Sequence, residues 1–182
     1  MTEVVKRGDY KNFTYKIYND DLTENPYDEG ALGTIYHWHR RGFTGEDYSQ
    51  NREELETLIE VIKLEGGVVL PLYLYDHSGW AVNTTGFSCP WDSGQVGYIA
   101  VSKETIKSEF SEAEITEEDI KTILKDEVKT LNHYFQGEVY QFDIYDEEAN
   151  LWDSCNGFID DLDEVEKLIK LTIDYQLIEE GL

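Results

Sequence analysis

Residues 68–102 hold three extended segments joined by turn-forming residues, and no other stretch of the chain restricts its possible folds as strongly. The run VVLPLYLYD, residues 68–76, is apolar, β-branched and aromatic, which is typical of a strand buried on at least one face. Residues 80–85 and 95–102 are predicted to form two more strands. In the intervening loop, residues 86–94, glycine permits positive φ and Pro90 pushes Cys89 toward extended backbone.

The remaining elements follow from periodicity and capping residues. Period-two alternation predicts strands at residues 10–18, 34–39, 138–146 and 151–158. Helices are predicted at 52–65, 102–110, 116–136 and 162–176, with a turn-rich connection at 40–50. Asn51 and Thr116 are expected to be N-caps. Glu54 follows Asn51 by three residues, as in a capping box, Asp119 is at the third helical position after Thr116, and Gly137 is expected just past the helix end. The last helix should turn Leu162, Val165, Leu168, Ile169 and Thr172 inward.

This order of elements predicts the fold class. Hairpin-like spacings between strands favour a mostly antiparallel sheet with helices packed on one face, which is an α+β fold. A length of 182 residues is most simply one domain, so we expect a single α+β domain spanning residues 1–182.

Charge restricts the class of partner. The formal net charge is −24, and residues 101–182 alone carry −16. Such a chain is not expected to bind nucleic acid directly through phosphates, whereas a basic partner is favoured, including the phosphate-binding channels of nucleic-acid enzymes. A solubility effect or a salt-adapted host is the alternative explanation. The candidate acidic binding residues flank the starts of two helices: Glu117, Glu118, Asp119, Asp160, Asp161, Asp163 and Glu164.

The sequence also predicts a cellular location. It contains no run of 18 apolar residues, and its first residues lack the apolar core of a signal peptide, so we expect neither membrane insertion nor secretion. The two cysteines, Cys89 and Cys155, are then expected to be reduced in the cytoplasm.

Cysteine and histidine suggest two kinds of chemistry without a specific motif for either. Cys89 with His77, oriented by Asp76 or Asp92, has the residue types of a thiolate site. Cys89, Cys155 and His77 with His37 or His39 have those of a zinc site, although the close pairs usual for structural zinc are missing. We therefore expect no cofactor, no metal and no catalytic residue, and we interpret the loop as a structural corner. Its candidate residues are Asp76, His77, Cys89, Pro90, Trp91, Asp92 and Gly94, with Cys155 in a related Asp-Ser-Cys segment.

Several segments resemble a family of small acidic proteins encoded on phages, plasmids and integrated elements of bacteria and archaea. The matching residues are 76–79 (DHSG), 87–99 (FSCPWDSGQVGYI), 101–104 (VSKE), 127–128 (EV), 137–140 (GEVY) and 153–158 (DSCNGF). The 87–97 piece is the most specific. The family commonly has an aromatic residue where this chain has Asn156, which puts in doubt any role that depends on that ring.

Length and charge are similar to those of an anti-CRISPR protein that inhibits type II CRISPR nucleases. The resemblance implies a cytoplasmic inhibitor in the host bacterial cell that binds a guide-RNA-loaded nuclease and blocks target DNA cleavage without catalysis. It transfers no contact residues. The alternatives are a general DNA-mimic antirestriction protein, whose acids should line one continuous face, and an enzyme or metal-binding protein centred on Cys89, His77 and Asp92.

Overall fold

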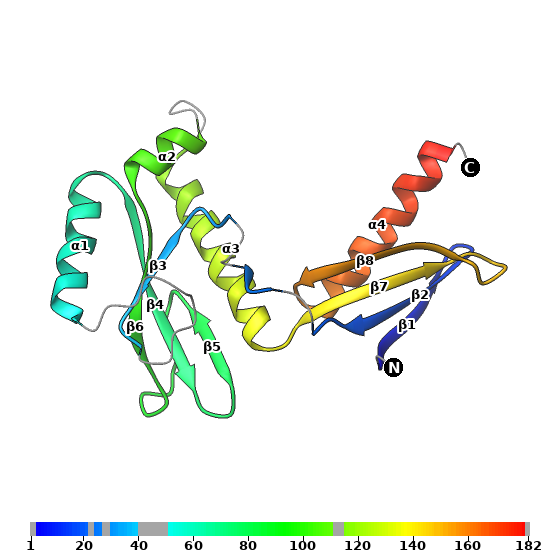
Figure 1. The fold of residues 1–182 in the computed structure, drawn as a ribbon, viewed down its shortest axis with the longest axis horizontal. Coiled ribbons are helices and arrows are strands. Elements are labelled where there is room, and N and C mark those ends of the chain that lie inside the picture. Colours follow the sequence, from blue (N-terminus) through cyan, green and yellow to red (C-terminus); the bar gives the residue numbers. More distant parts are fainter. Residues whose placement is uncertain (1–2, 22–23, 27–29, 40–50, 111–114, 181–182) are drawn as a thin grey trace. The chain divides into compact units, whose positions relative to one another are not determined.

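The protein folds into helices and antiparallel sheets that form two compact units. The computed structural model describes residues 3–21, 24–26, 30–39, 51–110 and 115–180; the connection expected at residues 40–50 lies outside them. The first unit comprises residues 1–24 with 137–182, and the second comprises residues 25–136 (Figure 1). The α+β class with antiparallel strands is confirmed, although the strands form two four-stranded sheets rather than one. A single domain for residues 1–182 stays a prediction.

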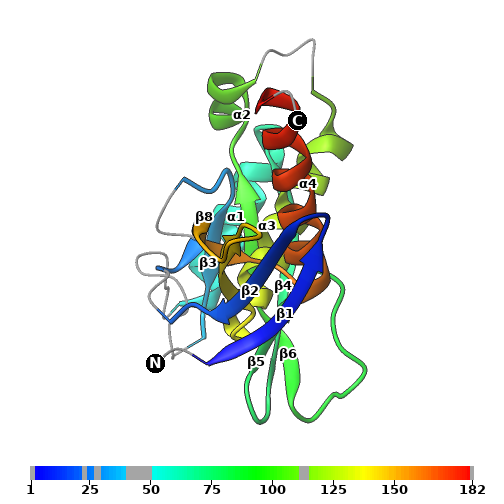
Figure 2. The same cartoon turned by 90° about the vertical axis from the view of Figure 1, so that its right-hand side faces the viewer.

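The first unit is a four-stranded sheet with one long helix on one face. Its elements are β1 (Val4–Tyr10), β2 (Phe13–Asn19), β7 (Val139–Tyr145), β8 (Leu151–Ile159) and α4 (Leu162–Glu180), with the sheet order β1-β2-β7-β8. Alternate residues of β2 and β7 point to the helix, which lies along the sheet (Figure 2). The buried core residues are Tyr15, Ile17, Tyr140, Phe142, Ile144, Val165, Ile169 and Ile173.

The inward face of α4 differs from the prediction. Val165 and Ile169 are buried as expected, but Leu168 is exposed, and Ile173 takes the core position next to the partly buried Thr172. The helix carries apolar residues on two faces, so periodicity alone did not identify which face the sheet covers.

The second unit has helices on both faces of its sheet. Its elements are β3 (Thr34–His37), α1 (Arg52–Leu64), β4 (Val68–Asp76), β5 (Trp80–Asn83), β6 (Ser93–Val101), α2 (Lys103–Glu109) and α3 (Glu117–Phe135), with the sheet order β3-β6-β4-β5. Leu72, Leu74 and Ile99 face α3, whereas Ala100 and Val69 face α1 (Figure 1). The expectation of helices on one face is wrong for this unit, because β4 and β6 are apolar on both sides.

Local signals for helix ends are confirmed. The Asn51 side chain accepts hydrogen bonds from the Glu53 and Glu54 amides at the start of α1. Thr116 caps α3 as expected, and together with Asp119 it forms a capping box, with the Asp119 amide donating to Thr116 Oγ1 over 3.2 Å. Gly137 follows α3 with φ +72°.

Candidate functional site

The loop that carries the most specific sequence motif lies at one end of the second unit. Asp76 ends β4, Trp80 begins β5 opposite it, and Ser93 begins β6 opposite Tyr75. The β4–β5 turn and the start of β6 therefore lie at the same end of this sheet, and the connection from β5, which leaves that strand opposite Tyr73, returns to this end (Figure 2). Residues 84–92, which make that connection, are called the motif loop below.

The start of the motif loop is held by a side-chain cap. Asn83 Oδ1 accepts hydrogen bonds from the amides of Thr85 (3.0 Å) and Gly86 (2.7 Å), and its Nδ2 donates to the Gly86 carbonyl. Gly86 has φ +87°, a backbone conformation that L side chains rarely adopt, which explains why a glycine stands there. The ring of Phe87 then packs 5.7 Å from that of Tyr75, which ties the loop to the sheet.

The end of the motif loop is fixed by backbone contacts. The Asp76 amide donates to the Asp92 carbonyl over 2.9 Å, and Ser93 Oγ donates to the Cys89 carbonyl over 2.5 Å. Pro90 lies between these two bonds, and Gly94 continues in β6 opposite Leu74. Both ends of the loop are thus bonded to the sheet, in agreement with a rigid connection.

Trp91, at the tip of the turn, does not belong to the core. Its side chain is 92% exposed, the highest value among the exposed large apolar residues of the described chain. The sequence interpretation used Trp91 as part of a packed corner, and the structure contradicts that placement. Because hydrogen bonds restrain the loop at both ends, the indole projects into solvent from a backbone that is held in place.

Cys89, Asp92 and His77 do come together beside Trp91. The Cys89 thiol donates to Asp92 Oδ2 over 3.5 Å, and His77 Nδ1 lies 3.6 Å from the same oxygen. The carboxylate therefore stands between sulfur and imidazole. A thiolate nucleophile needs the base at the sulfur, so this order of contacts favours a hydrogen-bonded loop cluster over an activated cysteine.

The residues named for a zinc site are not gathered. Cys89 is in the second unit, whereas Cys155 is exposed on β8 of the first unit, and both are free thiols. Among the residues that the structure describes, no cluster of three or more His, Cys, Asp or Glu side chains is arranged to hold a metal ion.

No helix in the described part is long and apolar enough to cross a membrane.

The acids at the start of α3 are exposed and partly paired. Lys121 Nζ lies 2.7 Å from Glu117 and 3.8 Å from Glu118, whose side chains are 71% and 72% exposed. Asp119 accepts hydrogen bonds from the Thr116 amide and hydroxyl, which hold the pKa of that carboxyl below its usual value. Glu117 and Glu118 are thus available to a partner, while Asp119 has a structural task.

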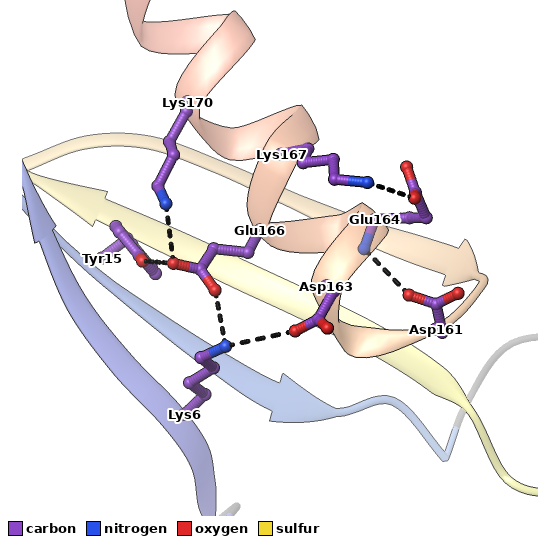
Figure 3. A network of polar contacts seen from close by, with 8 residues as sticks. All are labelled: Lys6, Tyr15, Asp161, Asp163, Glu164, Glu166, Lys167 and Lys170. Carbon is purple, nitrogen blue, oxygen red and sulfur yellow. Dashed lines mark hydrogen bonds and ion pairs between the residues drawn. The ribbon is translucent and has the colours of Figure 1, made fainter.

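The acids at the start of α4 show the same division. Asp161 caps the helix, because its Oδ1 accepts the Glu164 amide over 3.0 Å, and Asp160 accepts the Asp161 amide. Glu164 forms an ion pair with Lys167 (Figure 3). Asp163 is 84% exposed and makes a longer ion pair, with Lys6 Nζ 3.6 Å away. Both groups of candidate acids exist on the surface, but they belong to different units.

Glu166, which sequence reasoning missed, is an acid of the first unit that contacts three other side chains. It receives hydrogen bonds from Lys6, Tyr15 and Lys170, which lower its pKa to about 2 (Figure 3). Burial and the neighbouring carboxylate raise the pKa of Tyr15. Only the Glu166–Lys170 spacing of four residues was visible in the sequence, since Lys6 and Tyr15 arrive from β1 and β2.

No family model, curated protein or solved structure matches the chain. The motif loop of this strongly acidic protein presents an exposed tryptophan on a backbone that is hydrogen-bonded at both ends.

Proposed function

We propose that this protein is a non-catalytic inhibitor that binds a guide-RNA-loaded type II CRISPR nuclease and blocks target DNA cleavage. The observation that carries the proposal is the 92% exposure of Trp91 on a loop bonded at both ends. Tryptophan is enriched among the few residues that carry most of the binding energy of protein interfaces, and a side chain on an already fixed loop loses less conformational entropy on binding.

Charge supports the choice of a nucleic-acid enzyme as the partner. The net charge of −24 favours association with surfaces lined by lysine and arginine, such as the channels that hold guide and target strands. Glu117, Glu118 and Asp163 are the exposed acids best placed to contribute, because each is more than two-thirds exposed. The resemblance of residues 87–97 to proteins of mobile elements supports a role in evading host defence.

A second candidate is an enzyme that uses Cys89, and the convergence of Cys89, Asp92 and His77 favours it. Against it, the imidazole contacts the carboxylate and not the thiol hydrogen. The general DNA mimic receives less support, because several of the candidate acids cap helices or pair with lysines.

A cleavage assay tests the proposal. Purified type II nucleases, each loaded with guide RNA, are mixed with this protein before target DNA is added, at low and at physiological salt. The proposal expects inhibition that reaches completion near one molecule per nuclease and a complex that co-elutes in gel filtration. Inhibition at substoichiometric amounts with a dependence on Cys89 would favour the enzyme, and the absence of a complex with every nuclease at low salt would refute the proposal.

A further inference from the structure

Helix α4 carries a second apolar face that its own sheet does not cover. Leu171, Tyr175 and Ile178 are 63%, 62% and 76% exposed, and Leu168 at the edge of the group is 37% exposed. These four residues recur at intervals of three and four, so they form one stripe along the helix. Val165, Ile169 and Ile173 form a separate, inward stripe, which is buried in the core of the first unit. We call the outward residues 168, 171, 175 and 178 the outer stripe.

A hollow continues the outer stripe onto the edge of the sheet. About 390 Å³ of space lies between the start of α4 and the end of β8, and its walls include Phe158, Ile159, Leu168 and Leu171. Because β8 is an end strand of its sheet, the hollow is bounded by a sheet edge on one side and by the helix on the other. The hollow and the outer stripe share Leu168 and Leu171, so the apolar surface continues from the hollow along α4. We call this surface the groove below, and it suits the apolar face of an amphipathic helix.

The rim of this groove is acidic. Asp160 and Glu164 line the hollow, Glu179 lies beside Tyr175 at the other end, and the one lysine of the hollow, Lys167, is already paired with Glu164 over 2.5 Å. We propose that the groove of α4 and β8 binds a basic amphipathic helix of another protein, with leucine-like residues against the outer stripe and lysines or arginines against the rim. This inference does not rest on the proposed nuclease inhibition, and it assigns a surface in the other unit of the chain.

A second copy of the chain is the competing occupant. The outer stripe would be self-complementary in an antiparallel helix pair, but two molecules that each carry −24 would then meet through acidic rims. The charge of the surface therefore favours a cationic helix over self-association.

The experiment uses the full chain and a synthetic peptide of about 18 residues, which spans about 27 Å as a helix. The peptide carries leucine on one face and lysine on the other, and a control peptide has the same composition with the leucines distributed around the helix. Binding is measured by calorimetry for the wild type, for a Leu171→Ser/Tyr175→Ser variant, for Tyr175→Ser alone, and for a matched Leu58→Ser/Leu64→Ser variant on the exposed side of α1. Thermal unfolding verifies that every variant is folded, and sedimentation of the wild type alone determines its oligomeric state.

The proposal expects the amphipathic peptide to bind the wild type at least about tenfold more tightly than the control peptide does. The Leu171→Ser/Tyr175→Ser variant should lose at least about tenfold in affinity, Tyr175→Ser alone should lose less, and the α1 variant should bind as the wild type does. Three results would overturn it: equal affinity for both peptides, equal loss in the α1 variant, or a wild-type dimer that the α4 variant converts to monomer.

Discussion

Lys6 on β1 places its ammonium group 2.5 Å from the carboxylate of Glu166 on α4, which joins the edge of the first sheet to its helix. Tyr15 from β2 donates to the other oxygen of the same carboxylate over 2.5 Å, and Lys170 contacts that oxygen at 2.9 Å. One side chain thus connects two strands and one helix (Figure 3).

Stability in acid should depend on Glu166. Its pKa in the folded protein is about 2, below the ordinary value of 4.5, so the ionised form stabilises the fold above pH 4.5 and this contribution is lost as the pH falls toward 2. Glu166→Gln should lower the free energy of unfolding by roughly 1–2 kcal/mol at pH 7 and by less at pH 2.5. Urea unfolding followed by circular dichroism at both pH values measures it. A Glu164→Gln control should have little effect at either pH, and an equal loss from Glu166→Gln at both would contradict the account.

The two faces of α4 should respond differently to truncation. Ile169 is fully buried, so Ile169→Ala should cost about 2–4 kcal/mol of unfolding free energy through lost burial and a cavity. Leu171→Ala removes a mostly exposed side chain and should cost less than about 0.5 kcal/mol. The same urea titration compares the two variants. Similar losses would mean that the outer stripe is also part of a core.

The capping box of α3 should be worth about 1 kcal/mol. Thr116→Ala removes the side-chain acceptor of the Asp119 amide, and thermal unfolding should shift downward accordingly. Thr122→Ala removes another threonine on the same helix, whose hydroxyl donates to the Glu118 carbonyl, and should be close to neutral. A larger loss of thermal stability in Thr122→Ala than in Thr116→Ala would contradict the stabilising role of the capping box.

Cys89 should contribute little beyond its local contact. Its thiol is half-buried and donates one long bond to Asp92, so Cys89→Ala should cost less than about 1 kcal/mol and leave nuclease binding within about twofold of the wild type. A stable Cys89→Ala protein that has lost all inhibition would instead support the thiol enzyme.

Much of the secondary structure follows from local signals in the sequence. Thr116 and Asp119 mark the start of α3, and the apolar run of residues 68–76 coincides with β4. Only the last residue of strand β1, Tyr10, was predicted to be extended. The reason is that Val4–Tyr10 carries three charged residues and a glycine and lacks clear alternation. Gly8 stands there because Tyr15 lies across it, and a Cβ at that position would meet the phenol oxygen at 2.2 Å. That contact is not visible from either residue alone.

Long-range pairing explains the other differences. The two sheets exist because β7 returns to pair with β2, with Tyr15 opposite Ile144, and no local pattern specifies that register. The sequence named Cys89 and His77 with either Asp76 or Asp92, and the structure places the Asp92 carboxylate against both of the other side chains. The sequence could not show that Trp91 points to solvent, since a tryptophan in a glycine- and proline-containing loop is as compatible with a packed corner.

The affinity of a Trp91→Ala variant for a guide-loaded nuclease that the wild type inhibits shows whether Trp91 anchors the complex. Because Trp91 is exposed, the free energy of unfolding of the variant should lie within about 0.5 kcal/mol of the wild-type value. Its affinity should fall at least about thirtyfold, as expected for an interface anchor, while Leu64→Ala, which removes an 85% exposed leucine on α1, should bind as the wild type does. Unchanged affinity and inhibition in the Trp91→Ala protein would contradict the account.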